Sequence, residues 1–174
     1  MLLTQGALTI RNAETADAPT LCGWWNDGAV MEHAGFPHGL GTTAEKIAAS
    51  LAADSDDTRR RLMVELGGVP VGEMCTENLG GGVAEIDIKI CRADLQERGH
   101  GTKLLRLLIS DLFARGYGKI VLDTAPENTR ARHVYEKIGF VQTRIDKDSW
   151  TDQLGRKRSS VHYELTPADF EKKL

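Results

Sequence analysis

The segment Gln96-Glu97-Arg98-Gly99-His100-Gly101 carries residue types that could bind an anionic cofactor. Its two glycines stand one residue apart, and the apolar stretch 104–113, which predicts a helix, follows them. Glycine adopts backbone conformations that other residues avoid, and the free N–H groups at the start of a helix attract anions. The segment, continued to Thr102, therefore predicts a site for a phosphate or pyrophosphate group.

Two common phosphate-binding motifs do not fit this segment. Dinucleotide-binding folds place glycines in the pattern GxGxxG near the start of a βαβ unit, and P-loops need Gly-Lys followed by Ser or Thr. This chain instead has Gly101-Thr102-Lys103, late in the sequence. A plain tight turn remains the alternative interpretation of the glycine spacing.

The run that precedes the glycine segment, Glu85-Ile86-Asp87-Ile88-Lys89-Ile90, alternates charged and apolar residues. This pattern predicts a strand with one charged face. Because the run leads into the glycine segment, we expect a central strand whose charged face lines a cleft; a half-exposed strand with a solvated face is the alternative. A carboxylate there could bind an amine and take its proton, since an alkylamine of pKa ~10 is almost fully protonated at pH 7.

The glycine segment resembles the Gln/Arg-x-x-Gly-x-Gly/Ala motif of the GNAT acyltransferase superfamily, in which backbone amides bind the pyrophosphate of acetyl-CoA. A second stretch, 127–140, resembles another signature of that family, with Asn128, Ala131 and then Tyr135-Glu136-Lys137-Ile138-Gly139-Phe140. The resemblance extends from Leu8 to about Leu165. It implies a GNAT fold, with a mixed, mostly antiparallel central sheet and helices on both faces, and an N-acetyltransferase that uses acetyl-CoA.

The resemblance also implies roles for individual residues. Glu85 falls where histone-type members keep their general base, Asp87 is the second candidate, and a chain of water molecules without a side-chain base is left open. Tyr135 would protonate the departing thiolate, and the backbone N–H groups around Ile90 and Cys91 would bind the oxyanion, because this strand splays from the next one in the family. The predicted cofactor-binding residues are Ile90, Cys91, Gln96, Glu97, Arg98, Gly99, His100, Gly101, Thr102, Asn128 and Tyr135.

Three of these residues have simpler interpretations as well. Tyr135 could pack beside Ala131 and Ile138 on the inner face of its helix, and Asn128 could cap that helix. Cys91 raises a ping-pong route in which its thiol takes the acyl group, with a small core residue as the alternative.

Acceptor recognition is predicted from fewer residues. Trp24, Trp25, Trp150 and the loop 35–41 occupy segments that cover the acceptor cleft in similar enzymes, with core packing as the alternative for the tryptophans. The chain is most similar to the branch of ribosomal-protein N-terminal and aminoglycoside 6'-N-acetyltransferases, in which the aspartate that corresponds to Asp123 contacts the aminoglycoside. The predicted substrate-binding residues are Trp24, Glu85, Asp123 and Trp150.

The elements that position these residues alternate along one predicted domain, residues 1–174. Thr15 is expected to cap the first helix, Thr42 with Glu45 to form a capping box for the second, and 34–41 to be a glycine-rich loop. An antiparallel first half followed by strand-helix-strand units predicts a mixed α/β sheet with helices on both faces. The expected strands are 7–12, 61–66, 71–77, 83–91, 119–123, 141–150 and 158–165, and the later helices are 104–113 and 128–138.

Composition excludes several other classes of protein. A formal net charge of −3 argues against nonspecific nucleic-acid binding, and no apolar run approaches the ~20 residues of a membrane span. The start of the chain lacks a signal pattern, so we expect a cytoplasmic protein. Three cysteines without a C-x-x-C pair predict neither a metal site nor a disulfide framework.

The expected partners are acetyl-CoA and an amine acceptor, which is a small molecule or a protein N-terminus, and a homodimer is left open. Two other functions stay as alternatives: a module that binds acyl-CoA without turnover, as a sensor or scaffold, and a transferase that uses another donor such as succinyl-CoA. Retention of Glu85, Asn128 and Tyr135 favours the enzyme over the sensor.

Overall fold

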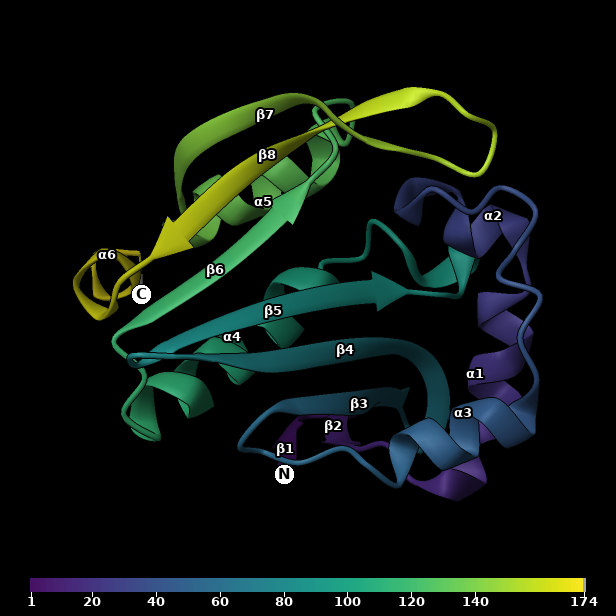
Figure 1. Ribbon diagram of the computed structural model, residues 1–174. Helices are drawn as coiled ribbons and strands as arrows, with labels where there is room; N and C mark the ends of the chain where they lie inside the picture. Colours follow the sequence, from purple (N-terminus) through teal and green to yellow (C-terminus); the bar gives the residue numbers. More distant parts are fainter. Residues whose placement is uncertain (174) are drawn as a thin grey trace.

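Strand β5 (Val83–Ile90) runs through the middle of an eight-stranded sheet in the computed structural model, which describes residues 1–173 (Figure 1). The strands lie in the order β1-β2-β3-β4-β5-β6-β8-β7, and every neighbouring pair except β5 and β6 is antiparallel. The other strands are β1 (Leu2–Gln5), β2 (Leu8–Asn12), β3 (Arg59–Leu66), β4 (Val69–Gly80), β6 (Lys119–Thr124), β7 (Val141–Thr151) and β8 (Lys157–Leu165).

The parallel pair β5 and β6 separates after a short paired stretch. Val83, Ala84 and Glu85 are opposite residues 119–121 of β6, whereas β5 stays paired with β4 as far as Ile90. Figure 1 shows the two strands diverging from this point, with the opening widest near α2 (Gly28–Met31). The central sheet is therefore split on one side of β5 beyond Glu85.

Helices cover both faces of the sheet, as predicted. α4 (His100–Ala114) packs an apolar stripe spaced by three and four residues onto the sheet, where it meets Ile86 and Ile120 in the main core. A second buried cluster on the other face joins α1 (Ala18–Trp25) and α3 (Ala44–Leu51) to Met63. The remaining helical segments are α5 (Thr129–Ile138), α6 (Pro167–Glu171), and the short turns η1 (Thr15–Asp17), η2 (Glu32–Ala34) and η3 (Ala93–Leu95).

Several boundaries differ from the sequence prediction. α3 is capped by Thr43, whose side chain accepts from the backbone N–H of Lys46 at 3.4 Å, while Thr42 donates its backbone N–H to the Asn26 side chain. The expected cap at Thr42 is thus wrong by one residue. Thr15 lies in the turn η1 rather than at the cap, and strand β1, helix α6 and the short helix α2 were not predicted.

Gly72 allows β4 to approach β5 next to the split. A Cβ atom at this position would lie 2.3 Å from the carbonyl oxygen of Lys89, which is backbone and has little room to move. We expect Gly72→Val to lower the free energy of unfolding by about 2 kcal/mol or more, the usual cost of forced overpacking. Urea denaturation measures this. Gly118→Val is the control, because a Cβ there meets nothing within 4 Å; equal loss in both variants would contradict the explanation.

Candidate active site

A cavity of about 1040 Å³ lies at the split between β5 and β6. Its walls come from β5, β6, the first turns of α4 and α5, and the segment of α2 and η2, with Trp150 and Ser160 from the β7–β8 hairpin. The volume is at the upper end of the range for small-molecule sites. The cavity can therefore take an elongated ligand together with a second, smaller one.

The α4 end of the cavity has the features of an anion site. Gly99 stands before the helix in the left-handed region, with φ of 77°, and the N–H of Lys103 is bonded back to the Gly99 oxygen at 3.3 Å. Helix geometry leaves the earlier N–H groups, including those of Gly101 and Thr102, without intrahelical partners. A Cβ at Gly101 would meet nothing within 4 Å, so the space beside this cavity-lining residue is open.

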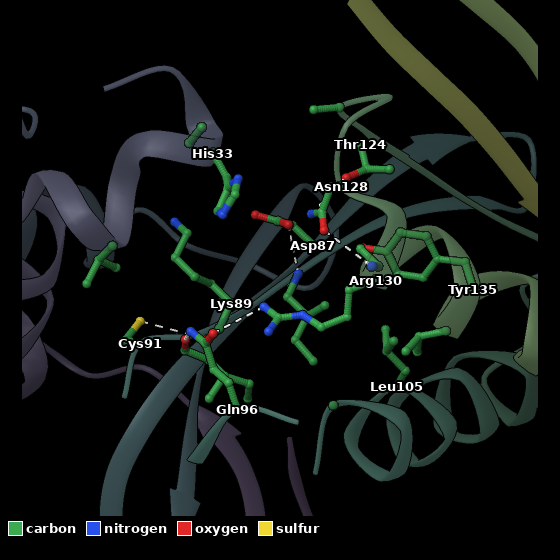
Figure 2. Close-up of a pocket in the computed structure, with 18 of the residues that line it drawn as sticks. His33, Asp87, Lys89, Cys91, Gln96, Leu105, Thr124, Asn128, Arg130 and Tyr135 are labelled. Atoms are coloured by element: carbon green, nitrogen blue, oxygen red, sulfur yellow. Dashed lines mark hydrogen bonds between the residues drawn. The ribbon is translucent and has the colours of Figure 1, made fainter. Parts of the chain in front are cut away.

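Side chains of the loop before α4 are tied to β5 and α5. Gln96 donates from Nε2 to the Ile90 oxygen at 3.0 Å, and Arg130 of α5 donates to Gln96 Oε1 at 3.1 Å (Figure 2). Arg130 lies 3.4 Å from a carboxylate oxygen of Glu97, and all three of these side chains line the cavity. Arg98, a predicted cofactor residue, is not among the lining residues, whereas the unpredicted Arg130 adds a positive charge beside the α4 end.

The backbone of β5 turns N–H groups toward the split at alternate residues. The N–H of Cys91 donates to the Val71 oxygen at 2.9 Å, so the prediction of an oxyanion donor at Cys91 is wrong. Because strand groups alternate in direction, those of Ile88 and Ile90 face away from β4. Consistent with this, the N–H of Ile88 bonds the Asp87 side chain at 2.8 Å and the Ile90 oxygen accepts from Gln96. The Ile90 N–H faces the split.

Tyr135 is 7% exposed and reaches the cavity from α5. Its ring packs edge-on against Phe140 and Tyr163, with centroids 5.8 Å apart in both pairs, so the packing interpretation is confirmed. Burial raises the pKa of its phenol well above the usual range, and the negative charges of Asp87 and Asp123 add to the shift. The phenol therefore stays protonated at neutral pH and can donate a proton or hydrogen bond.

Two carboxylates face the cavity from opposite sides of the split, Asp87 on β5 and Asp123 on β6. Glu85, the first candidate for the base, lies on the paired part of β5 and is not among the residues that line the cavity. Burial raises its pKa, as do Asp123, Glu77 and Asp87 nearby. The structure thus brings Asp87 and Asp123 to the cavity wall and leaves Glu85 behind them.

Two further predicted residues, Asn128 and Cys91, line the cavity. Asn128 caps α5, because its Oδ1 accepts from the N–H of Ala131 at 3.3 Å, and its Nδ2 donates to Thr124 at the same distance. Burial raises the pKa of the Cys91 thiol to about 12. A thiol that holds its proton so firmly is a poor nucleophile, which argues against a ping-pong route through Cys91.

The acceptor side is enclosed by two segments far apart in the sequence. Gln153 in the turn between β7 and β8 donates its N–H to the Gly35 oxygen at 2.9 Å and its Nε2 to the Gly39 oxygen at 3.0 Å, and its Oε1 accepts from the His38 N–H at 2.8 Å. We name these three bonds the Gln153 bridge. They join the loop after η2 to the β7–β8 hairpin at the wide end of the split.

Of the three tryptophans, only Trp150 lines the cavity, and Arg158 lies over its ring at 6.0 Å. Trp24 packs with the α1 and α3 cluster, so the structure does not bring this predicted substrate residue to the cavity. Lys89 and His33 also line the cavity, although neither was among the predicted site residues. The strand alternation already put Lys89 on the face of Asp87, but the short helices around His33 left no clear periodic signal.

No group of three or more His, Cys, Asp or Glu side chains within residues 1–173 is placed to hold a metal ion. Over the same residues, none of the helices combines the length and apolar character that crossing a membrane requires.

The sequence of this chain is similar to those of known acetyltransferases. Residues 7–141 match the family model for the acetyltransferase (GNAT) domain. An aminoglycoside N(6')-acetyltransferase type 1 of Klebsiella pneumoniae is 31% identical over 150 residues, which cover 77% of this chain and 74% of that one. The [ribosomal protein bS18]-alanine N-acetyltransferase of Haemophilus ducreyi is 35% identical over 66 residues; the match covers 38% of this chain and 46% of that relative's length.

Among solved structures, spermidine N-acetyltransferase from Vibrio cholerae, in complex with CoA and spermine, superposes with a TM-score of 0.82 at 22% identity, covering 96% of this chain and 99% of the other. This likeness confirms the predicted fold. The family match, which spans more than half of the chain, confirms the resemblance drawn from the two motifs. The chain therefore belongs to the GNAT family and is an acyl-CoA-dependent N-acetyltransferase.

Proposed function

We propose that this protein transfers an acetyl group from acetyl-CoA to a primary amine by direct attack within a ternary complex. One observation carries the proposal. The split of the sheet brings to one cavity the start of helix α4, a backbone N–H of β5 that points away from β4, a buried phenol and two carboxylates. In the transfer, the amine nitrogen forms a bond to the acetyl carbon and the carbon–sulfur bond breaks. CoA leaves as a thiol.

The α4 side of the cavity fits the cofactor. We propose that the N–H groups of Gly101 and Thr102 bind the pyrophosphate, because helix starts favour anions and no Cβ fills this space. Arg130 lies beside them and can neutralise further phosphate charge. The buried Nδ1 of His100 has no hydrogen-bond partner among residues 1–173, which supports a ligand contact here. When bound, acetyl-CoA supplies the thioester that the amine attacks.

The carboxylates fit a cationic amine. We propose that Asp87 and Asp123 bind the ammonium group from both sides of the split and that Asp87 takes its proton. Glu85 lies two residues before Asp87 on the same face of β5, and its raised pKa suits it to receive the proton afterwards through water. The N–H of Ile90 faces the split and is the proposed donor to the oxyanion.

Tyr135 is the proposed donor to the departing thiolate. We expect Tyr135→Phe to lower kcat by about tenfold, less than most acid–base effects because water in the cavity can also protonate a thiolate. The KM for acetyl-CoA should change little, since the ring still packs on Phe140 and Tyr163. Steady-state release of CoA thiol measures both values. Tyr117→Phe, outside the cavity, is the control; equal rates in wild type and Tyr135→Phe would leave Tyr135 with packing alone.

The proposed function is tested by CoA-thiol release from acetyl-CoA and succinyl-CoA with a panel of primary amines. Acetyl transfer to at least one amine is the expected result. Release with succinyl-CoA alone would change the donor, and CoA binding without release on any amine would support the sensor instead.

We further infer that the chain works as a single domain in the cytoplasm, where acetyl-CoA is available. The three cysteines are free thiols in the structure, which is consistent with a reducing compartment. A homodimer remains part of the proposal, because the edge strand β7 exposes Val141 and Ile145 that a second copy could cover. Cell fractionation and analytical ultracentrifugation test the two points.

A further inference from the structure

Lys89 is a cation within a site that otherwise suits a cationic substrate. It lies two residues beyond Asp87 on the same face of β5, and its direct partner on β4 is Glu73. Its Nζ is 3.1 Å from Glu73 Oε1 and 3.3 Å from the sulfur of Met31. An ammonium group has three N–H donors, so one donor is left for a ligand in the cavity.

The position of Lys89 is fixed by a second layer of contacts. Trp25 donates from Nε1 to both carboxylate oxygens of Glu73, at 2.9 and 3.0 Å, and Arg61 lies over the Trp25 ring at 6.0 Å. The side chains of Lys89 and Glu73 are only 20% and 12% exposed. A lysine held in this way loses little further side-chain freedom when it binds a ligand.

Groups of both charge types converge at the acceptor end. Figure 2 shows the Lys89 ammonium, the His33 ring and the Asp87 carboxylate directed toward the same part of the cavity. Asp27, the other acid on this side, accepts the N–H of Ala29 at 2.8 Å as the cap of α2. Next to the carboxylates of Asp87 and Asp123, the cavity therefore offers a cation and an imidazole that can donate hydrogen bonds.

We propose that the acceptor is an amine that carries a carboxylate a few bonds away, such as a free amino acid or another aminocarboxylic acid. This inference rests on the proposed acetyl transfer to amines and adds the class of acceptor. The ammonium end lies between Asp87 and Asp123, and the carboxylate accepts hydrogen bonds from Lys89 and His33. A polyamine fits less well, because its next ammonium would lie against Lys89, and like charges repel at close range.

The alternative is that Lys89 and Glu73 form only a cross-strand ion pair that stabilises the sheet. The two roles differ in substrate preference. A structural pair changes stability without changing which amine reacts, whereas a carboxylate-binding lysine decides between an acid and its uncharged amide.

The test compares kcat/KM for matched acceptors: alanine with alaninamide, 4-aminobutanoate with 4-aminobutanamide, and putrescine as the dication. Taking the ratio of each pair in wild type and in Lys89→Gln cancels the different intrinsic reactivity of the amines. We expect the ratio of kcat/KM for the acid to kcat/KM for its amide to be about 10- to 100-fold lower in Lys89→Gln than in wild type, the range for a hydrogen bond to a charged group. Lys89→Arg should keep most of the preference.

A double variant and a surface control separate loss of substrate preference from loss of stability. Lys89→Gln leaves the Glu73 carboxylate without its cation, which could destabilise the protein. The double variant Lys89→Gln with Glu73→Gln has no unpaired charge at this position, and it should lose the preference for the acid as fully as Lys89→Gln does. Lys46→Gln, on the exposed face of α3, is the matched control and should not alter the ratio. An unchanged ratio in Lys89→Gln, or putrescine as the best wild-type acceptor, overturns the inference. If CoA binds but no amine is acetylated, the proposed function itself fails.

Discussion

Asp87→Asn is expected to reduce turnover by on the order of 10²-fold or more near pH 7, the usual size of a lost general base. Asp87 is the carboxylate of β5 that lines the cavity, and its negative charge helps to raise the pKa of the Tyr135 phenol. The amide keeps the size of the side chain and an oxygen for the Ile88 N–H. Acetyl-CoA should therefore bind as in wild type, which calorimetry can measure separately from CoA release.

The loss of turnover in Asp87→Asn should depend on pH. An alkylamine of pKa ~10 becomes increasingly neutral as the pH rises, so it needs less help to lose its proton. The deficit of Asp87→Asn should thus shrink steadily between pH 7 and pH 10. A deficit that stays constant over this range would mean that Asp87 binds the acceptor without taking its proton.

Glu85→Gln is the matched comparison, because it removes a carboxylate two residues earlier on the same face. We expect a smaller loss there, since Glu85 does not line the cavity. A larger loss in Glu85→Gln than in Asp87→Asn would return the role of base to Glu85. If both variants turn over at the wild-type rate, deprotonation runs through water alone.

Gly101→Leu should weaken the binding of CoA by about 100-fold or more. The added side chain would occupy the open space in front of the α4 N–H groups and displace the phosphate from several charge-assisted hydrogen bonds. Leucine is a good helix former, so the melting temperature should be unchanged or slightly higher. Titration calorimetry with CoA and a thermal melt separate the two effects.

Gly23→Leu is the control for this variant. Gly23 is also helical, has no left-handed φ, and a Cβ there meets nothing within 4 Å. It lies outside the cavity, so CoA affinity should be that of wild type. Wild-type affinity in Gly101→Leu would show that the phosphates bind elsewhere. Gly99 is a less useful position, because its φ of 77° would strain any other residue.

Local patterns were sufficient to predict most of the fold. The alternation in 85–90 gave β5 and its two faces, and the apolar spacing in 104–113 gave most of α4. The prediction fell one residue short at the cap of α3, where Thr42 and Thr43 are adjacent and both able to cap. Short helices such as α2 have too few turns to show a period, so a loop was predicted on the acceptor side where the structure has α2 and η2.

The chemistry of the site depends on strand pairing that local patterns do not contain. Alternation places Glu85 and Asp87 on one face, but only the pairing with β6 shows that the strands separate between these two residues. The same is true of Ile90 and Cys91, whose N–H directions depend on which residue of β4 lies opposite. Counting from the glycine motif therefore identifies the strand, whereas the pairing with β6 decides which of its carboxylates lines the cavity.

The Gln153 bridge connects the two sides of the split at its wide end. Backbone pairing joins its two sides at Glu85, and the bridge joins them again near Gly35, so neither side can rotate outward freely. The span across the acceptor end is then set by the length of the β7–β8 hairpin. Changes of length in the turn 152–155 would resize that opening while leaving β5, α4 and α5 untouched, which gives this fold a way to change its acceptors independently of its chemistry.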